Sequence, residues 1–242
     1  MDFRSIPPVV KNLLIINGLF LLATMLLAHK GIDLTEYFGL HYWKSEGFRP
    51  HQLITYMFMH GGFTHLLFNM FALWMFGRIL EQVWGAKRFL IYYVITGIGA
   101  GIIQLLVTYF RLMPFTSGLP PDSMNLILKE GYSALQEGKN FVDPVMAQIN
   151  IMVNTTTVGA SGAVFGILLA FGMLFPNTRL MLLFPPIPIK AKWFVIGYGA
   201  IELFSGIANN PYDNVAHFAH LGGMLFGFIL IKIWKKDRNH FY

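Results

Sequence analysis

Six polar side chains that could do chemistry lie in otherwise apolar stretches of the sequence: His60, His65, Asn69, Ser161, His217 and His220. Ionisable and strongly polar groups are costly within membrane-like segments, so their presence there suggests function. A serine hydroxyl becomes a nucleophile when an adjacent imidazole accepts its proton. The residue types therefore indicate acyl transfer by a serine with a histidine base.

Ser161 is the candidate nucleophile. It lies in Gly159-Ala160-Ser161-Gly162, after a loop-like run of threonines and before an apolar run that predicts a helix. The first backbone N–H groups of a helix have no partner within the helix, and such donors can stabilise an oxyanion. The alternative is a serine that only caps the helix or packs against a neighbouring one.

His220 is the candidate general base. His220, Gly223 and Gly227 are spaced three and four residues apart and so share one helix face, and Gly162 and Gly166 have the same spacing after Ser161. Glycines allow close helix contact, so we expect these two faces to meet and to bring His220 to Ser161. The alternative is a purely structural crossing with His220 bonded to a backbone carbonyl.

His217 is one helical turn from His220 but closer to polar residues at the predicted helix end, which favours a solvated or structural role. His65 and Asn69 are four residues apart on one face and both can donate hydrogen bonds. Together with the Ser161 backbone N–H, they are candidates for an oxyanion hole. The alternative for this pair is polar contact between helices.

A metal site is the rival interpretation, because four histidines are expected near one face. His60 and His65 are five residues apart, which is not the spacing of the HExxH zinc motif, and no acidic residue accompanies these motifs. We therefore predict no metal and no organic cofactor. Glu202 is the only acid well inside a predicted span, so it is either protonated or bonded to a partner that the sequence does not name.

The elements that must position these residues are membrane helices. The 242 residues are 55% hydrophobic and only 12% charged, which excludes a soluble globule and a disordered chain. The absence of cysteine excludes disulfides and thiolate chemistry. Windows without charge predict a single all-α membrane domain over residues 1–242, with spans near 12–29, 53–77, 89–110, 159–176, 193–210 and 214–232 and a long outer loop over 111–158.

Orientation follows from the basic residues of the loops. With the N-terminus inside, twelve Lys and Arg residues lie on the inner side and six on the outer side, which favours cytoplasmic termini. We expect a multi-pass protein of a bacterial inner (plasma) membrane. The polar cluster would then open to the outer side.

Three motifs together resemble the rhomboid family of intramembrane serine proteases: His60-Gly-Gly-Phe-Thr-His65-Leu-Leu-Phe-Asn69, Gly159-Ala160-Ser161-Gly162, and Ala219-His220-Leu-Gly-Gly223 with Gly227. The resemblance implies a six-span bundle and a Ser161–His220 dyad with no acid as third member. One departure is His51-Gln52, which stands where family members often have Trp-Arg. The long loop after the third span is another, and neither receives a role from the family.

The resemblance also implies what the protein acts on. Substrates would be single-span membrane proteins in the lipid bilayer, cut in or near the span, with no nucleic acid partner. The sequence leaves the oligomeric state open. Two alternatives remain: a catalytically inactive relative that binds membrane clients, and a polytopic transporter, although the chain lacks two matching halves.

Overall fold

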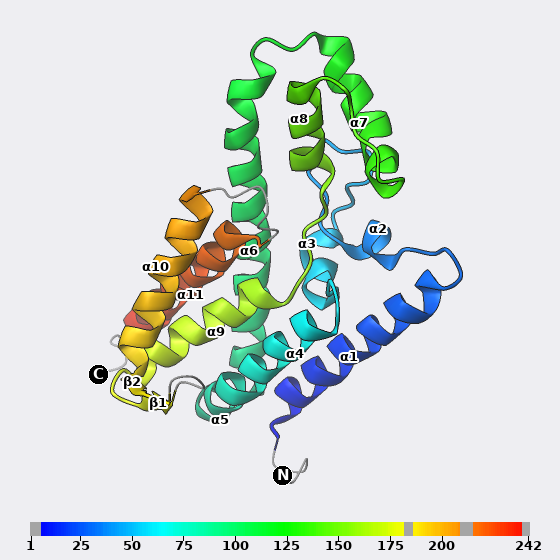
Figure 1. The fold of residues 1–242 in the computed structure, drawn as a ribbon. Coiled ribbons are helices and arrows are strands. Elements are labelled where there is room, and N and C mark those ends of the chain that lie inside the picture. The colour runs from blue at the N-terminus through cyan, green and yellow to red at the C-terminus, as the bar shows by residue number, and fades with distance from the viewer. Residues whose placement is uncertain (1–5, 182–185, 209–214, 239–242) are drawn as a thin grey trace.

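The computed structural model describes residues 6–181, 186–208 and 215–238, and these are mostly helical. Figure 1 shows a tilted bundle with a smaller helical pair beside one end of α6. The elements in chain order are α1 (Pro8–Ala28), α2 (Leu34–Phe38), α3 (Gln52–Thr55), η2 (Tyr56–Phe58), α4 (Phe63–Ala72), η3 (Leu73–Gly77), α5 (Arg78–Trp84), α6 (Ala86–Thr116), α7 (Pro121–Gln136), α8 (Pro144–Asn154), α9 (Ser161–Leu174), β1 (Arg179–Met181), β2 (Pro188–Lys190), α10 (Ala191–Ala208) and α11 (His217–Arg238).

Four helices of the described chain are long and apolar enough to cross a membrane: Pro8–Ala28, Phe63–Trp84, Ala86–Thr116 and His217–Lys235. Helix α9 is apolar but has only 14 residues, about 21 Å at 1.5 Å per residue. Many large apolar side chains of α1 and α10 are exposed, as expected for surfaces that face lipid. The protein is an integral, multi-pass membrane protein.

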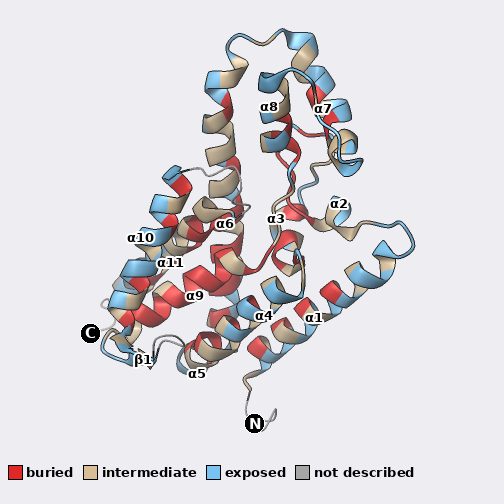
Figure 2. Cartoon of the chain, viewed as in Figure 1, coloured by how far each residue is buried: buried red, intermediate tan, exposed pale blue. Residues whose placement is uncertain are grey.

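Helix α9 is the centre of the bundle. Ten of its 14 residues are buried, and it packs against α6, α10 and α11. Figure 2 shows this helix as a nearly continuous buried segment, whereas α1 and α10 are exposed along much of their length. The residue that begins α9, Ser161, is therefore held by the most enclosed element of the fold.

The helices overlap the predicted spans, but the second predicted span, 53–77, is not one helix. Residues 52–58 form short turns, the chain breaks at residues 59–62, and a new helical segment then continues from Phe63 to Trp84 through a π-helical turn. Gly62 has φ +151°, which lies in the region that favours glycine. The paired glycines that follow His60 therefore mark a helix start, and the polar residues 65 and 69 lie in the first turns of α4.

The glycine contacts differ in part from the expected pairing. A Cβ built on Gly223 would meet the backbone oxygen of Gly162, so α9 and α11 touch directly at this pair. Gly166 instead makes room for Thr96 of α6, and Gly227 makes room for the Tyr92 hydroxyl of the same helix. The reason is that α6 packs against both helices and its Thr96 and Tyr92 side chains cover the second glycine of each pair, so only Gly162 and Gly223 meet directly.

Glu81 of α5 is 3% exposed and accepts hydrogen bonds from the backbone of α1. Its two carboxylate oxygens lie 2.9 Å from the N atom of Val9 and 2.8 Å from that of Val10. Pro8 has no N–H, and Lys11 N–H already bonds Pro7 O. Glu81 therefore caps the start of α1 from another helix.

The long segment 111–158 is largely helical. Helix α6 continues to Thr116, and α7 and α8 then form the pair that stands beside its far end (Figure 1). The Asn154 side chain donates to Ile127 O at 3.0 Å, which joins α8 to α7, and to Asn150 Oδ1 within α8 at 2.8 Å. At the other end of the bundle, β1 and β2 form a two-stranded antiparallel hairpin between α9 and α10, a small departure from an all-α fold.

Candidate active site

Ser161 is the first residue of α9, and the turn before it is hydrogen-bonded to η2. Gly159 N–H donates to Tyr56 O at 2.9 Å, and the first helical bond runs from Val164 N–H to Ala160 O at 3.0 Å. The N–H groups of residues 161–163 therefore come before the first helical hydrogen bond of α9 and have no acceptor in that pattern. The hydroxyl lies where such donors are available, as the loop-to-helix transition predicts.

His220 approaches Ser161 from α11. Its Nε2 lies 2.8 Å from Ser161 Oγ, a hydrogen-bond distance between side chains 59 residues apart. The imidazole stacks on Phe165, one turn after Ser161, with ring centroids 4.2 Å apart and planes 6° apart. The close contact of Gly223 with Gly162 sets the helix separation, and the stack fixes the plane of the ring.

Glu202 of α10 corrects the expectation that no acid accompanies the motifs. Its Oε2 lies 2.8 Å from His220 Nδ1 and 2.6 Å from His217 Nδ1. The partner that the sequence could not name is thus a pair of imidazoles. His217 lies against the carboxylate and is only partly exposed, so it is not the solvated group that its position near polar residues suggested.

Gly159 explains how His65 faces the serine. A Cβ on Gly159 would lie 3.0 Å from His65 Nε2 and 3.5 Å from Ser161 Oγ, so the space between His65 and Ser161 lies beside the Gly159 backbone, where a side chain would crowd it. The φ of +129° also favours glycine here. Gly61 N–H donates to His65 Nδ1 at 3.3 Å, so Nε2 carries the proton and can donate into that space.

Asn69 is buried on the same helix, and its side-chain amide donates to His65 O at 2.9 Å. A side-chain amide nitrogen has two hydrogens, so Asn69 has a second N–H that can donate. His60 lies beside His65, with ring centroids 5.1 Å apart. The structure thus brings His65, Ser161 and His220 together, links Asn69 to this group through the His65 carbonyl, and adds Glu202 and Phe165, which sequence spacing did not select.

Gln52 organises the turn over residues 47–52, which precedes α3. Its side-chain oxygen accepts from Arg49 N–H at 3.1 Å, and its side-chain nitrogen donates to Gly47 O at 2.9 Å. The neighbouring His51 is exposed and contacts Tyr37 O through Nε2 at 3.0 Å. His51-Gln52 stands where family members often have Trp-Arg, and here the buried Gln52 amide closes the turn over residues 47–52.

Glu202, His217 and His220 also form a group that could hold a metal ion, because one ligand atom from each lies within 4.8 Å of the others. Both Nδ1 atoms, however, lie at hydrogen-bond distance from one carboxylate oxygen. An acceptor-only carboxylate calls for a proton on each Nδ1, and a metal would need those same lone pairs. The observed distances fit the hydrogen-bonded arrangement.

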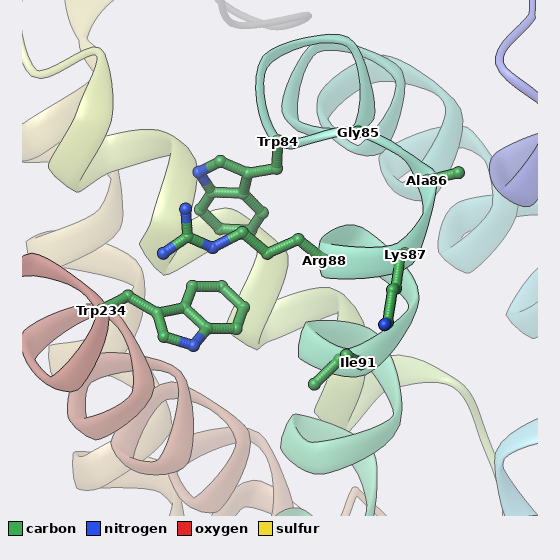
Figure 3. Close-up of a pocket in the computed structure, with 7 residues that line it drawn as sticks. All are labelled: Trp84, Gly85, Ala86, Lys87, Arg88, Ile91 and Trp234. Carbon is green, nitrogen blue, oxygen red and sulfur yellow. The ribbon is translucent and has the colours of Figure 1, made fainter. Parts of the chain in front are cut away.

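A pocket of about 420 Å³ lies far from this cluster, where α5 meets α6 and the late part of α11. Figure 3 shows the Arg88 side chain between the indoles of Trp84 and Trp234, with its guanidinium carbon 4.2 Å from the Trp234 ring centroid. Trp234 follows His220 by 14 residues of one helix, about 21 Å. The pocket therefore belongs to the opposite end of the bundle from Ser161.

The chain matches the Rhomboid domain family over residues 47–120 and 125–236. It belongs to the rhomboid family. The match includes both histidine-bearing helices, α9 and most of the long segment 111–158. Membership supports, at the level of the family, an intramembrane serine protease. The apolar helices agree with a protein embedded in the membrane.

Three rhomboid relatives illustrate the range of similarity. The chain is 28% identical to the rhomboid-family protein YdcA of Bacillus subtilis over 98% of this chain and 95% of that protein. It is 27% identical to the mitochondrial rhomboid protein 1 of Saccharomyces cerevisiae over 75% of this chain and 42% of the relative. It is 27% identical to the rhomboid protease AarA of Providencia stuartii over 72% of this chain and 52% of the relative.

Proposed function

We propose that the protein is an intramembrane serine endopeptidase that cleaves transmembrane segments through Ser161 and His220. The observation that carries the proposal is the 2.8 Å contact between Ser161 Oγ and His220 Nε2, made by two helices that touch at a glycine pair. A nucleophile within hydrogen-bond reach of its base is the signature of covalent acyl transfer. An inactive client-binding relative would have no need of this contact.

His220 Nε2 takes the proton of Ser161 as Oγ attacks the peptide carbonyl, and then returns it to the leaving amine. Water hydrolyses the resulting ester with the same base. The negative charge on the tetrahedral oxygen is stabilised by the Ser161 backbone N–H, the protonated Nε2 of His65 and the free amide hydrogen of Asn69. We place that oxygen between His65 and Ser161, beside the Gly159 backbone, which both side chains approach closely.

The chain would cross the membrane six times, with α9 and α10 joining the four longer helices and both termini in the cytoplasm. The shortness of α9 is compatible with a site below the outer surface, because a helix of about 21 Å cannot span a hydrocarbon core of about 30 Å and at least one of its ends lies within it. The near full-length similarity to a Bacillus subtilis protein supports a bacterial plasma membrane. Single-span membrane proteins would reach the site from the bilayer.

The test is cleavage of a transmembrane peptide by purified protein in liposomes, with wild type compared with Ser161→Ala. We expect the alanine variant to fold and to lose cleavage, and a fluorophosphonate to label the wild type at Ser161. EDTA should leave activity unchanged. Undiminished cleavage by Ser161→Ala would refute the proposed nucleophile, and loss of activity with EDTA would point to a metal enzyme instead.

A further inference from the structure

Glu202 is an acid buried in a helix that is otherwise largely exposed. It is 6% exposed, whereas apolar neighbours on α10 such as Leu203 and Phe204 are 45% and 74% exposed. A carboxylate in such a setting is strongly unfavourable unless hydrogen bonds and opposite charge compensate it. His217 and His220 are the hydrogen-bond partners that compensate the buried carboxylate.

The contacts run through opposite nitrogens of one ring. Glu202 Oε2 lies 2.8 Å from His220 Nδ1, and His220 Nε2 lies 2.8 Å from Ser161 Oγ. An ionised carboxylate only accepts, so the proton of the neutral imidazole is held on Nδ1 and the lone pair of Nε2 points at the hydroxyl. This is the tautomer that a base for Ser161 requires.

We infer that Glu202 is a positioning residue that completes a Ser161–His220–Glu202 triad, an inference that rests on the proposed protease function. The carboxylate orients the imidazole and holds its proton on the far nitrogen. It also stabilises the imidazolium that forms when His220 accepts the serine proton. That stabilisation is larger within the bundle than in water, because the local dielectric constant is low.

His217 fixes the carboxylate itself. Its Nδ1 lies 2.6 Å from the same Oε2, and the two imidazole rings are nearly perpendicular, at 86°. Two donors on successive turns of α11 thereby hold one oxygen of a side chain on α10. The hydrogen bonds also tie α10 to α11 at the level of the serine, so the position of the base depends on both helices.

The experiment compares Glu202→Gln and Glu202→Asp with wild type in liposomes, and uses Glu81→Gln as the matched control. Glu81 is also a buried acid, but it contacts the backbone of α1 and not the site. Four quantities are measured on each protein: kcat and KM for a transmembrane peptide, the rate of fluorophosphonate labelling of Ser161, and the thermal midpoint.

We expect Glu202→Gln to lower kcat by about 10²- to 10⁴-fold with little change in KM, and to slow labelling in parallel. Glu202→Asp retains the charge and should recover part of that loss. Glu81→Gln should lower the thermal midpoint and leave kcat of the folded protein unchanged. A purely structural role for Glu202 would instead lower the midpoint without slowing the labelling of the folded protein.

A measurement on the wild type guards against variants that fail to fold. Nitrogen-15 spectra of histidine-labelled protein should show His220 protonated at Nδ1 and unprotonated at Nε2, and the opposite tautomer would overturn the inference. Full kcat in Glu202→Gln would do the same. If Ser161→Ala is inactive while Glu202→Gln is fully active, only the triad fails; if Ser161→Ala is active, the protease proposal itself fails.

Discussion

Glu81 of α5 and Glu202 of α10, the buried acidic side chains of the described residues, hold different kinds of partner. Glu81 divides its two oxygens between the N–H groups of Val9 and Val10, which are fixed parts of a helix end. Glu202 presents one oxygen to two imidazoles, which are side chains that can gain and lose protons.

The difference separates structure from chemistry. Backbone amides cannot change charge, so a carboxylate that binds them contributes to stability alone. An imidazole that also contacts a hydroxyl can pass a proton, so a carboxylate that binds it can affect a rate. The partner of a buried acid therefore tells more about its role than its burial does, and the following variants test that distinction.

Removal of the base should have the largest effect. His220→Ala should lower kcat by at least about 10²- to 10⁴-fold and suppress fluorophosphonate labelling, since nothing would then take the Ser161 proton. His217→Ala keeps the base and should retain measurable turnover. The two variants are compared in the liposome cleavage assay. A dead His217→Ala beside an active His220→Ala would reverse the assignment of the two histidines.

Disruption of the contact between Gly223 and Gly162 should have the second largest effect. Gly223→Val would push the α11 backbone away from Gly162 and misplace the base, and an error of about 1 Å can lower a rate by about 100-fold. Gly227→Val would press on Tyr92 of α6, whose hydroxyl donates to Gly166 O, so its loss of activity should be smaller. Equal and full activity in both would show that the α9–α11 contact does not set the serine–histidine distance.

Loss of the Glu81 carboxylate should affect stability and not rate. Glu81→Gln keeps an acceptor for one amide of α1 but replaces the other oxygen with a donor, and an unsatisfied buried group costs about 1–3 kcal/mol. We expect a lower thermal midpoint in detergent and an unchanged kcat per folded molecule. A fall in kcat at an unchanged midpoint would remove the contrast between the two acids.

The smallest expected effect concerns His41, a buried histidine in the segment between α2 and α3. Burial lowers the pKa of His41 below its ordinary value of 6.5, because its ring is enclosed beside Tyr132. The unfolded chain then binds the proton more readily, so this stability is present above the ordinary pKa and declines as pH falls below it. His41→Gln should reduce the drop in thermal midpoint between about pH 7.5 and about pH 5, and an unchanged drop would exclude His41 as its source.

Structural features that depend on a local residue pattern could be predicted from the sequence. Charge-free windows located the long helices, the loop-to-helix transition located Ser161, and a three-then-four spacing placed His220 on the face that meets α9. Break points were harder: the interruption at residues 59–62 lies inside one apolar window, and only its paired glycines signalled it. The helices α7 and α8 lie in a polar segment whose packing depends on asparagine contacts between them.

The features that escaped prediction depend on contacts between distant elements. Glu202 precedes His220 by 18 residues, but the two meet only because α10 and α11 pack side by side. Gly166 and Gly227 share the spacing of the contacting pair, and yet α6 lies against both of them. Periodicity identifies the face of a helix, and it does not say which of several neighbours covers that face.

The cap on α1 has a consequence for how the chain is assembled during synthesis. Val10 emerges 71 residues before the carboxylate that binds its N–H. Until Glu81 is made, the first amides of α1 need water or lipid headgroups as partners, which favours keeping that end at the membrane surface. The dependence is mutual, because a chain shortened past α1 would leave Glu81 as a charge without its donors. The first helix therefore cannot be removed as a detachable anchor without loss to the rest of the bundle.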